Sequence, residues 1–294
     1  MGSSRTIWKA CAVLIPAVLI AAASAGGRSL ADQDGKDRHA RSTGQGWPRI
    51  AYPPARPIRE AQEFAASRGD VSFAVTDDSI GMRGYDVDRE FSSASLSKAL
   101  LLAAELRRLD REDLPLDSET RGLLEPMVTY SDNGAADAVY AEVGDEGLEE
   151  VARRAGMRDF EATPGFWGGD QITAADMARF FYRLESNLPG PHRAYAKRLL
   201  TDITPVERWG IPQVIGHGWS VWFKGGWRPA GEEDTSGADT HQAALLVHRG
   251  GERLALAVLS DEAPGDVGGY SAIEGVTERL LATPPPHRDG WLTP

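Results

Sequence analysis

Thiols are nearly absent from this chain, in which Cys11 is the single cysteine among 294 residues. One cysteine excludes an intramolecular disulfide and a zinc site built from several cysteines. The six histidines do not follow H-x-x-x-H or a similar metal-ligand spacing. We therefore expect a protein that works with no metal ion and no other cofactor.

Basic residues are outnumbered by acidic ones. Lys and Arg number 32 against 43 Asp and Glu, the formal net charge is -11, and no run of basic residues occurs. Because phosphate contacts need clustered Lys and Arg, we expect no nucleic-acid partner. The 41% hydrophobic and 26% charged residues are ordinary for a globular protein, and the length allows a sizeable core.

The N-terminus has the organisation of an export signal. An apolar run over residues 10–22 follows the basic residues Arg5 and Lys9 and leads to a small-x-small pattern ending at Ala25. This pattern predicts a cleaved signal peptide over residues 1–25. The run is shorter than the ~20 residues of a membrane span, although an uncleaved anchor is the alternative. We expect a secreted or cell-envelope protein that meets the membrane only through this segment.

The order of patterns along the chain predicts an α+β fold. Residues 26–57 are rich in Gly, Ser, Asp, Arg and Pro and predict a flexible leader. Beyond them come strands, a block of helices, strands and a final helix. This order predicts one domain over residues 58–283, with an antiparallel sheet completed from both chain ends, flanking helices, and an inserted all-helical subdomain at about 95–205. Residues 284–294 would form a tail, and we expect a monomer.

Apolar periodicity places the individual elements. Spacings of three and four predict helices over 58–67, 94–109, 119–130, 133–143, 148–155, 174–184, 195–200 and 271–281. Alternation and short apolar runs predict strands over 71–76 (half-buried), 80–87, 219–224, 243–248 and 254–259, the last two as a hairpin.

A first candidate for chemistry is Ser95-Leu96-Ser97-Lys98 at a predicted helix start. Residues i and i+3 share a helix face, so Ser95 and Lys98 can meet. A lysine whose pKa is lowered can take the serine proton and activate the hydroxyl. The same four residues also fit a serine helix cap followed by a surface lysine, and taken alone they favour that interpretation.

The second candidate is Ser131-Asp132-Asn133, between two predicted helices. A short loop there can project a hydroxyl and an amide into a cleft. Taken alone, these residues are better explained as a turn or a helix cap, and Asp132 is expected to brace the loop.

The third candidate is Lys224-Gly225-Gly226, at the expected end of the strand over 219–224. Two glycines allow another backbone to approach closely. A solvated strand end followed by a hairpin turn is the alternative.

Together, the three motifs resemble the ordered signature of penicillin-recognising serine enzymes. The segment 170–178 is similar to the one that leaves the Ω-loop of class A β-lactamases, and residues 210–219 are similar to the approach to their lysine strand. The resemblance covers roughly 58–281. We identify the chain as similar to the class A β-lactamase and transpeptidase-like serine hydrolases.

The resemblance implies a catalytic set of four side chains. Ser95 would be the nucleophile that forms an acyl-enzyme, and Lys98 would be its proton acceptor or electrostatic partner. Ser131 would pass a proton to the leaving nitrogen. Lys224 would support that proton path and attract the substrate carboxylate.

The resemblance also implies the substrate-binding residues. Asn133 would bind the substrate amide, and the backbone N–H groups of Ser95 and Trp227 would form an oxyanion hole. Gly226 and Arg228 flank Trp227 and are expected to line the same site. The expected partner is a small β-lactam or a peptidoglycan peptide.

One departure from the family concerns carboxylate recognition. Gly225 stands where the family has Thr or Ser, so the hydroxyl that would bind the substrate carboxylate is missing. Arg228 is a candidate replacement. The missing side chain predicts that Gly225→Thr improves binding of carboxylate-bearing β-lactams.

A second departure concerns hydrolysis. The Glu-x-x-x-Asn of the family's Ω-loop is not found, since residues 157–172 hold one glutamate, Glu161, and no asparagine. In class A enzymes that Glu activates the water that hydrolyses the acyl-enzyme. Glu161 and Asp170 are possible substitutes, but the sequence places neither near Ser95.

Three functions follow from these departures. The first is a β-lactamase-like serine hydrolase with slow deacylation, acting on β-lactams or a related amide or ester. The second is a D,D-carboxypeptidase-type penicillin-binding protein. The third is a non-catalytic protein that uses the same fold to bind cell-wall peptides.

Overall fold

A computed structural model describes residues 52–78, 81–228, 238–262, 265 and 267–285. The described residues belong to one compact unit, 47–294. The expected signal peptide, most of the expected leader, and the tail beyond residue 285 lie outside the described residues. None of the helices in the described part is long and apolar enough to cross a membrane.

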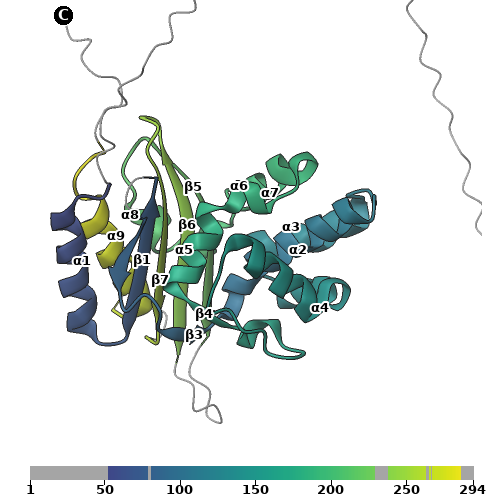
Figure 1. Cartoon of the computed structure of the whole chain (residues 1–294), viewed down its shortest axis with the longest axis horizontal. Helices are drawn as coiled ribbons and strands as arrows, with labels where there is room; N and C mark the ends of the chain where they lie inside the picture. The colour runs from purple at the N-terminus through teal and green to yellow at the C-terminus, as the bar shows by residue number, and fades with distance from the viewer. Residues whose placement is uncertain (1–51, 79–80, 229–237, 263–264, 266, 286–294) are drawn as a thin grey trace, which may run out of the picture. The chain divides into compact units, whose positions relative to one another are not determined.

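Five antiparallel strands form the main sheet (Figure 1), in the order β2-β1-β7-β6-β5. Strands from the N-terminal and the C-terminal part of the chain both contribute to this sheet, as the sequence predicted. The strands are β1 (Val71–Asp77), β2 (Gly81–Tyr85), β5 (Trp219–Arg228), β6 (Asp239–His248) and β7 (Arg253–Ser260). Strands β6 and β7 form the expected hairpin, and β5 lies at an edge of the sheet.

Helices occupy the chain between these two sets of strands. They are α2 (Ser97–Arg111), α3 (Ser118–Thr129), α4 (Asn133–Ala155), α5 (Ala174–Tyr182), α6 (Leu184–Asn187), α7 (Arg193–Leu199) and α8 (Ile211–Val214). Gly144, with φ 59° and ψ -172°, breaks α4, which accounts for the two separate helices expected over this stretch. Helices α1 (Ala55–Arg68) and α9 (Gly269–Leu281) complete the fold near its two ends.

Two hydrophobic cores lie on opposite faces of the sheet. Helices α1, α8 and α9 lie on one face, and α5 covers the other, with α2, α3, α4, α6 and α7 beyond it (Figure 1). The prediction that β1 is half-buried is wrong, because all seven of its residues are buried. In β1, Phe73 packs toward α1 and α9, whereas Ala74 belongs to the helical core.

A small second sheet, which the sequence did not indicate, ties the helical block to the start of α2. It pairs β3 (Glu90–Ser92) with β4 (Gln171–Thr173). The 3₁₀ turn η1 (Ala94–Leu96) follows β3 directly and leads into α2. Turn η1 packs against β5, so the sheet edge and the start of α2 face each other.

Candidate active site

Ser95 lies in η1, in the tight passage from β3 to α2. The preceding residue, Ala94, has φ 45°, a left-handed conformation that a side chain with a Cβ rarely adopts. Ser95 is half-buried, whereas Leu96 is fully buried in the helical core. The turn therefore presents the Ser95 hydroxyl at the edge of the core rather than within it.

Lys98 is buried one helical turn after Ser95, with no exposed surface. Its Nζ lies 3.0 Å from Ser95 Oγ and 3.2 Å from Ser131 Oγ. It also donates to the backbone oxygen of Ser131 and to Asn133 Oδ1, the latter at 2.6 Å. The structure thus brings four of the expected site residues to one point, including both members of the i, i+3 pair.

The partners of Lys98 decide what its amine can do. A carbonyl oxygen only accepts, so two N–H bonds are committed to Ser131 O and Asn133 Oδ1. A neutral amine has one lone pair left, which can accept a hydroxyl proton. Burial lowers the pKa of Lys98 to about 8, opposed by the carboxylates of Glu207, Asp132 and Asp137. A large share of this amine is neutral near pH 8, as a proton acceptor requires.

The Ser131-Asp132-Asn133 loop joins α3 to α4 and aims two side chains at Lys98. Ser131 has φ 58°, a further left-handed non-glycine residue, of the kind that clusters at functional sites. Asp132 accepts from the Ala135 N–H at 2.7 Å and caps α4. The cap holds the loop in place, as expected for Asp132.

Lys224, on β5, also contacts the Ser131 hydroxyl. Its Nζ donates to Ser131 Oγ at 3.0 Å and to the backbone oxygen of Gly225 at 2.7 Å. Burial lowers the pKa of Lys224 to about 7, and the nearby charge of Lys98 lowers it further, against the carboxylate of Glu207. Ser131 therefore bridges two buried amines.

The expectation that Lys224 ends its strand is wrong. Strand β5 continues to Arg228, with Gly225 opposite Gln242 and Gly226 opposite His241 on β6. Pairing with β6 overrides the turn preference of two consecutive glycines, because the ladder supplies their backbone partners.

Gly226 is the point of closest approach between β5 and the Ser95 turn. A Cβ added to Gly226 would lie 2.8 Å from the Ser95 nitrogen and 2.9 Å from the Leu96 nitrogen. Trp227, the next residue, is 45% exposed. The structure thus places the backbone of residues 226–227 beside the Ser95 turn, but it pairs Arg228 with Asp239, Nη2 to Oδ2 at 2.7 Å.

Gly225 faces a tryptophan that sequence reasoning did not connect with it. Its Cβ would lie 2.8 Å from Cζ2 of the Trp209 indole, which stacks on Tyr270 with 4.5 Å between ring centroids. Trp209 is only 8% exposed. This contact argues against the prediction that Gly225→Thr improves carboxylate binding, because the indole already fills the space that the threonine needs.

The segment before β4 packs against the base of the Ser95 turn. Ser97 Oγ bonds to Asp170 Oδ2 at 3.1 Å, and the Ser93 N–H donates to the Asp170 backbone oxygen at 2.8 Å. Burial raises the pKa of Asp170 to about 7. Glu161 is exposed and its backbone pairs with Gln171. The Asp170 side chain thus braces this turn.

Trp167, also in this segment, covers one side of Lys98. Lys98 Nζ lies 5.0 Å from the centroid of the Trp167 ring. The indole Nε1 donates to Asp137 Oδ1 at 2.8 Å, and the Trp167 backbone oxygen accepts from Ser93 Oγ. An indole, and not a carboxylate, is therefore held against this face of the lysine.

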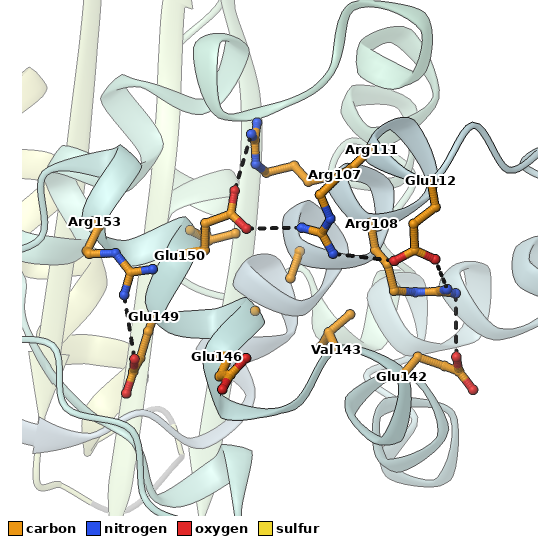
Figure 2. Close-up of a pocket in the computed structure, with 13 residues that line it drawn as sticks. Arg107, Arg108, Arg111, Glu112, Glu142, Val143, Glu146, Glu149, Glu150 and Arg153 are labelled. Carbon is orange, nitrogen blue, oxygen red and sulfur yellow. Dashed lines mark hydrogen bonds and ion pairs between the residues drawn. The ribbon is translucent and has the colours of Figure 1, made fainter.

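A separate charged hollow of about 570 Å³ lies between α2 and α4 (Figure 2). Arg107 and Arg111 both pair with Glu150, and Arg153 pairs with Glu149. None of the residues that line it belongs to the Ser95 cluster. Among the described residues, no group of three His, Cys, Asp or Glu side chains is placed to hold a metal ion.

Comparison with known proteins places the chain among β-lactamase relatives. A model of the β-lactamase enzyme family matches residues 118–283. The protein named lipoprotein LppW from Mycobacterium tuberculosis is 29% identical over 167 residues, which is 54% of this chain and 53% of LppW. The chain thus spans about half the length of the curated relatives that it matches.

Solved structures share the fold at low identity. A class A β-lactamase from Bacteroides cellulosilyticus has a TM-score of 0.65 and 15% identity, covering 77% of this chain and 97% of that one. PBP-A has a TM-score of 0.65 and 16% identity, covering 79% and 98%. A variant of PBP-A, similar at a TM-score of 0.64, is an acyl-enzyme complex with penicillin G. This chain has the class A β-lactamase and PBP-A fold as a divergent member.

Proposed function

Because the chain belongs to the β-lactamase enzyme family, we propose that it is a serine hydrolase that forms an acyl-enzyme on Ser95. Its substrates are β-lactams or related amides and esters, including peptidoglycan peptides. The observation that carries this proposal is the position of Lys98 Nζ, buried at 3.0 Å from Ser95 Oγ with two of its N–H bonds committed to carbonyl oxygens.

In the proposed reaction, Ser95 Oγ attacks the amide carbonyl carbon and its proton passes to Lys98 Nζ. The new Oγ–C bond forms and the C–N bond breaks. The leaving nitrogen takes a proton from Ser131 Oγ, which Lys98 or Lys224 then replaces, since both amines lie within 3.2 Å of it. The backbone N–H groups of Ser95 and Trp227 bind the oxygen that becomes negative in the transition state.

We propose that hydrolysis of the acyl-enzyme is the slow half of this cycle. Water must add to the ester and release Ser95, which requires a base near the ester. One side of Lys98 is covered by Trp167, and the Asp170 carboxyl accepts from the Thr163 N–H and bonds to Ser97. A penicillin-binding protein of the D,D-carboxypeptidase type, which keeps its acyl group longer, is therefore the second candidate.

We further propose a place in the cell envelope. The residues before Ala25 have the pattern of an export signal, and the LppW relatives carry the name of lipoproteins. A serine acyltransferase acting on peptidoglycan peptides works at that location.

Acylation is tested by measuring intact protein mass before and after incubation with benzylpenicillin. We expect a mass increase equal to the whole antibiotic, because the ring opens and no atoms leave. The adduct is expected to be absent from Ser95→Ala and present in Ser220→Ala, a matched change at an exposed serine on β5.

The lifetime of the adduct separates the candidates. Turnover of nitrocefin that Ser95→Ala abolishes supports a β-lactamase, whereas an adduct that persists for hours supports a penicillin-binding protein. No adduct and no product with the wild-type chain, from benzylpenicillin or from its methyl ester, would contradict both enzymes and leave the non-catalytic peptide-binding protein.

The rate of this acylation is expected to depend on pH through Lys98. Below its pKa of about 8 the amine is protonated and cannot accept the Ser95 proton, so the rate falls by about tenfold per pH unit. Because Lys98 and Lys224 share Ser131, the pKa values of about 8 and about 7 describe two titration steps of the pair rather than of either residue alone. Adduct formation followed by mass at several pH values checks this. A flat profile between pH 6 and pH 8 would remove Lys98 from its role as base.

A further inference from the structure

The part of β5 next to Lys224 is covered by an aromatic ring that cannot easily move. Trp209 fills the space beside Gly225, and its ring stacks on Tyr270. Its backbone oxygen accepts from Gln242 Nε2 at 2.8 Å, which ties the Trp209 segment to β6. Because the indole is 8% exposed and packs in the core on the α1 and α9 face of the sheet, a side chain at position 225 would have to displace it.

An acidic side chain belongs to the same segment as Trp209. Glu207, two residues before Trp209, interacts electrostatically with both Lys98 and Lys224. A carboxylate here offsets the positive charge of the two amines. It also repels a second carboxylate that approaches Lys224.

The nearby arginine is engaged by a buried acid. Arg228 Nη2 lies 2.7 Å from Asp239 Oδ2, and the Asp239 side chain is 5% exposed. Breaking this pair to bind a substrate anion would leave a buried carboxylate without its partner, which is costly. Arg228 is therefore a poor replacement for the hydroxyl that Gly225 lacks.

A substrate carboxylate beside Gly225 is disfavoured by four features described above: the missing hydroxyl, the buried indole, the Glu207 carboxylate and the ion pair of Arg228. We propose that this site selects acyl donors whose group beside Gly225 is uncharged, an amide or an ester, over donors with a free carboxylate there. This inference rests on the acylation of Ser95 proposed above. For a peptide, it means attack on an internal amide bond rather than removal of a C-terminal residue.

The test compares two probes that differ only in this charge: benzylpenicillin and its methyl ester. For each, the rate of whole-probe addition to Ser95 is measured by intact mass. The wild-type chain is expected to react with the ester at least as fast as with the acid. In Trp209→Ala/Gly225→Thr, removal of the indole makes space for the new hydroxyl. The rate with the acid divided by the rate with the ester is expected to rise by about tenfold or more, the value of a hydrogen bond to a charged group.

A second variant does not depend on repacking an aromatic cluster. Glu207→Gln removes the negative charge and is expected to move the ratio toward the acid by about two- to fivefold, as for a partly exposed charge. Asp202→Asn, an equivalent change at an exposed position five residues earlier, is expected to leave the ratio unchanged.

The outcomes separate this inference from the proposed function. The proposed selectivity would be overturned if the wild-type chain reacted at least tenfold faster with the acid than with the ester. An unchanged acid-to-ester rate ratio in Glu207→Gln would overturn it too. Either result would leave the proposed acylation of Ser95 intact. No adduct from either probe would overturn both.

Discussion

Replacing Lys98 with methionine is expected to slow acylation of Ser95 by about 10²–10⁴-fold, the usual contribution of a general base. The lysine Nζ is the group within 3.0 Å of Ser95 Oγ, and methionine supplies neither a proton acceptor nor a donor. The remaining reaction should also lose its rise with pH. Both effects are measured by following the benzylpenicillin adduct by mass over a range of pH.

Folding is not the expected cause of that loss. Lys98 has no exposed surface, and burying a charged amine disfavours the folded state, so an apolar chain of similar length is tolerated there. The matched control is Lys197→Met on α7, which loses an ion pair with Glu185 but is expected to acylate at the wild-type rate. A Lys98→Met rate within threefold of wild type would exclude Lys98 as the base.

Adding one methyl group at Gly226 is expected to slow acylation about 100-fold. In Gly226→Ala the new Cβ would lie 2.8 Å from the Ser95 nitrogen and 2.9 Å from the Leu96 nitrogen. Those atoms belong to the backbone of η1, just before α2, and cannot rotate away, so β5 and the Ser95 turn must separate. A displacement of about 1 Å at a reacting centre costs about 10²-fold in rate.

A glycine-to-alanine change at a position with open surroundings shows whether the steric contact, rather than the loss of a glycine, causes the effect. Gly216→Ala meets no atom within 4 Å, lies outside the left-handed region, and is expected to leave the rate unchanged. We expect Gly226→Ala to lower the stability toward urea by about 1–3 kcal/mol, the usual cost of overpacking. Full acylation activity in Gly226→Ala would show that β5 does not fix the Ser95 turn.

Sequence patterns predicted the parts of this molecule whose determinants are local. The i, i+3 spacing of Ser95 and Lys98 places both on one side of the passage from η1 into α2, and their side chains meet. The order of strands and helices predicted an antiparallel sheet that both chain ends complete. Asp132 was expected to brace its loop, and it caps α4.

Residues that act through distant contacts could not be found in this way. Trp209 precedes Gly225 by sixteen positions, and nothing in either segment indicates that the indole takes the place of a side chain on β5. Trp167 and Asp170 reach the Ser95 turn only because β4 pairs with β3. Lys224 was expected at a strand end because two glycines follow it, whereas pairing with β6 extends the strand.

The pairing of β1 with β7 has a consequence for synthesis of the chain. Phe73 on β1, the first strand, lies opposite Val258 on β7, the last strand of the described residues, so the sheet cannot close until β7 has been synthesised. Until then β1 and β2 have only each other, which is too little for a stable sheet in water. Translation must therefore be nearly finished before the molecule folds, and a truncation that removes residues 253–260 would cut the sheet in two rather than shorten one edge.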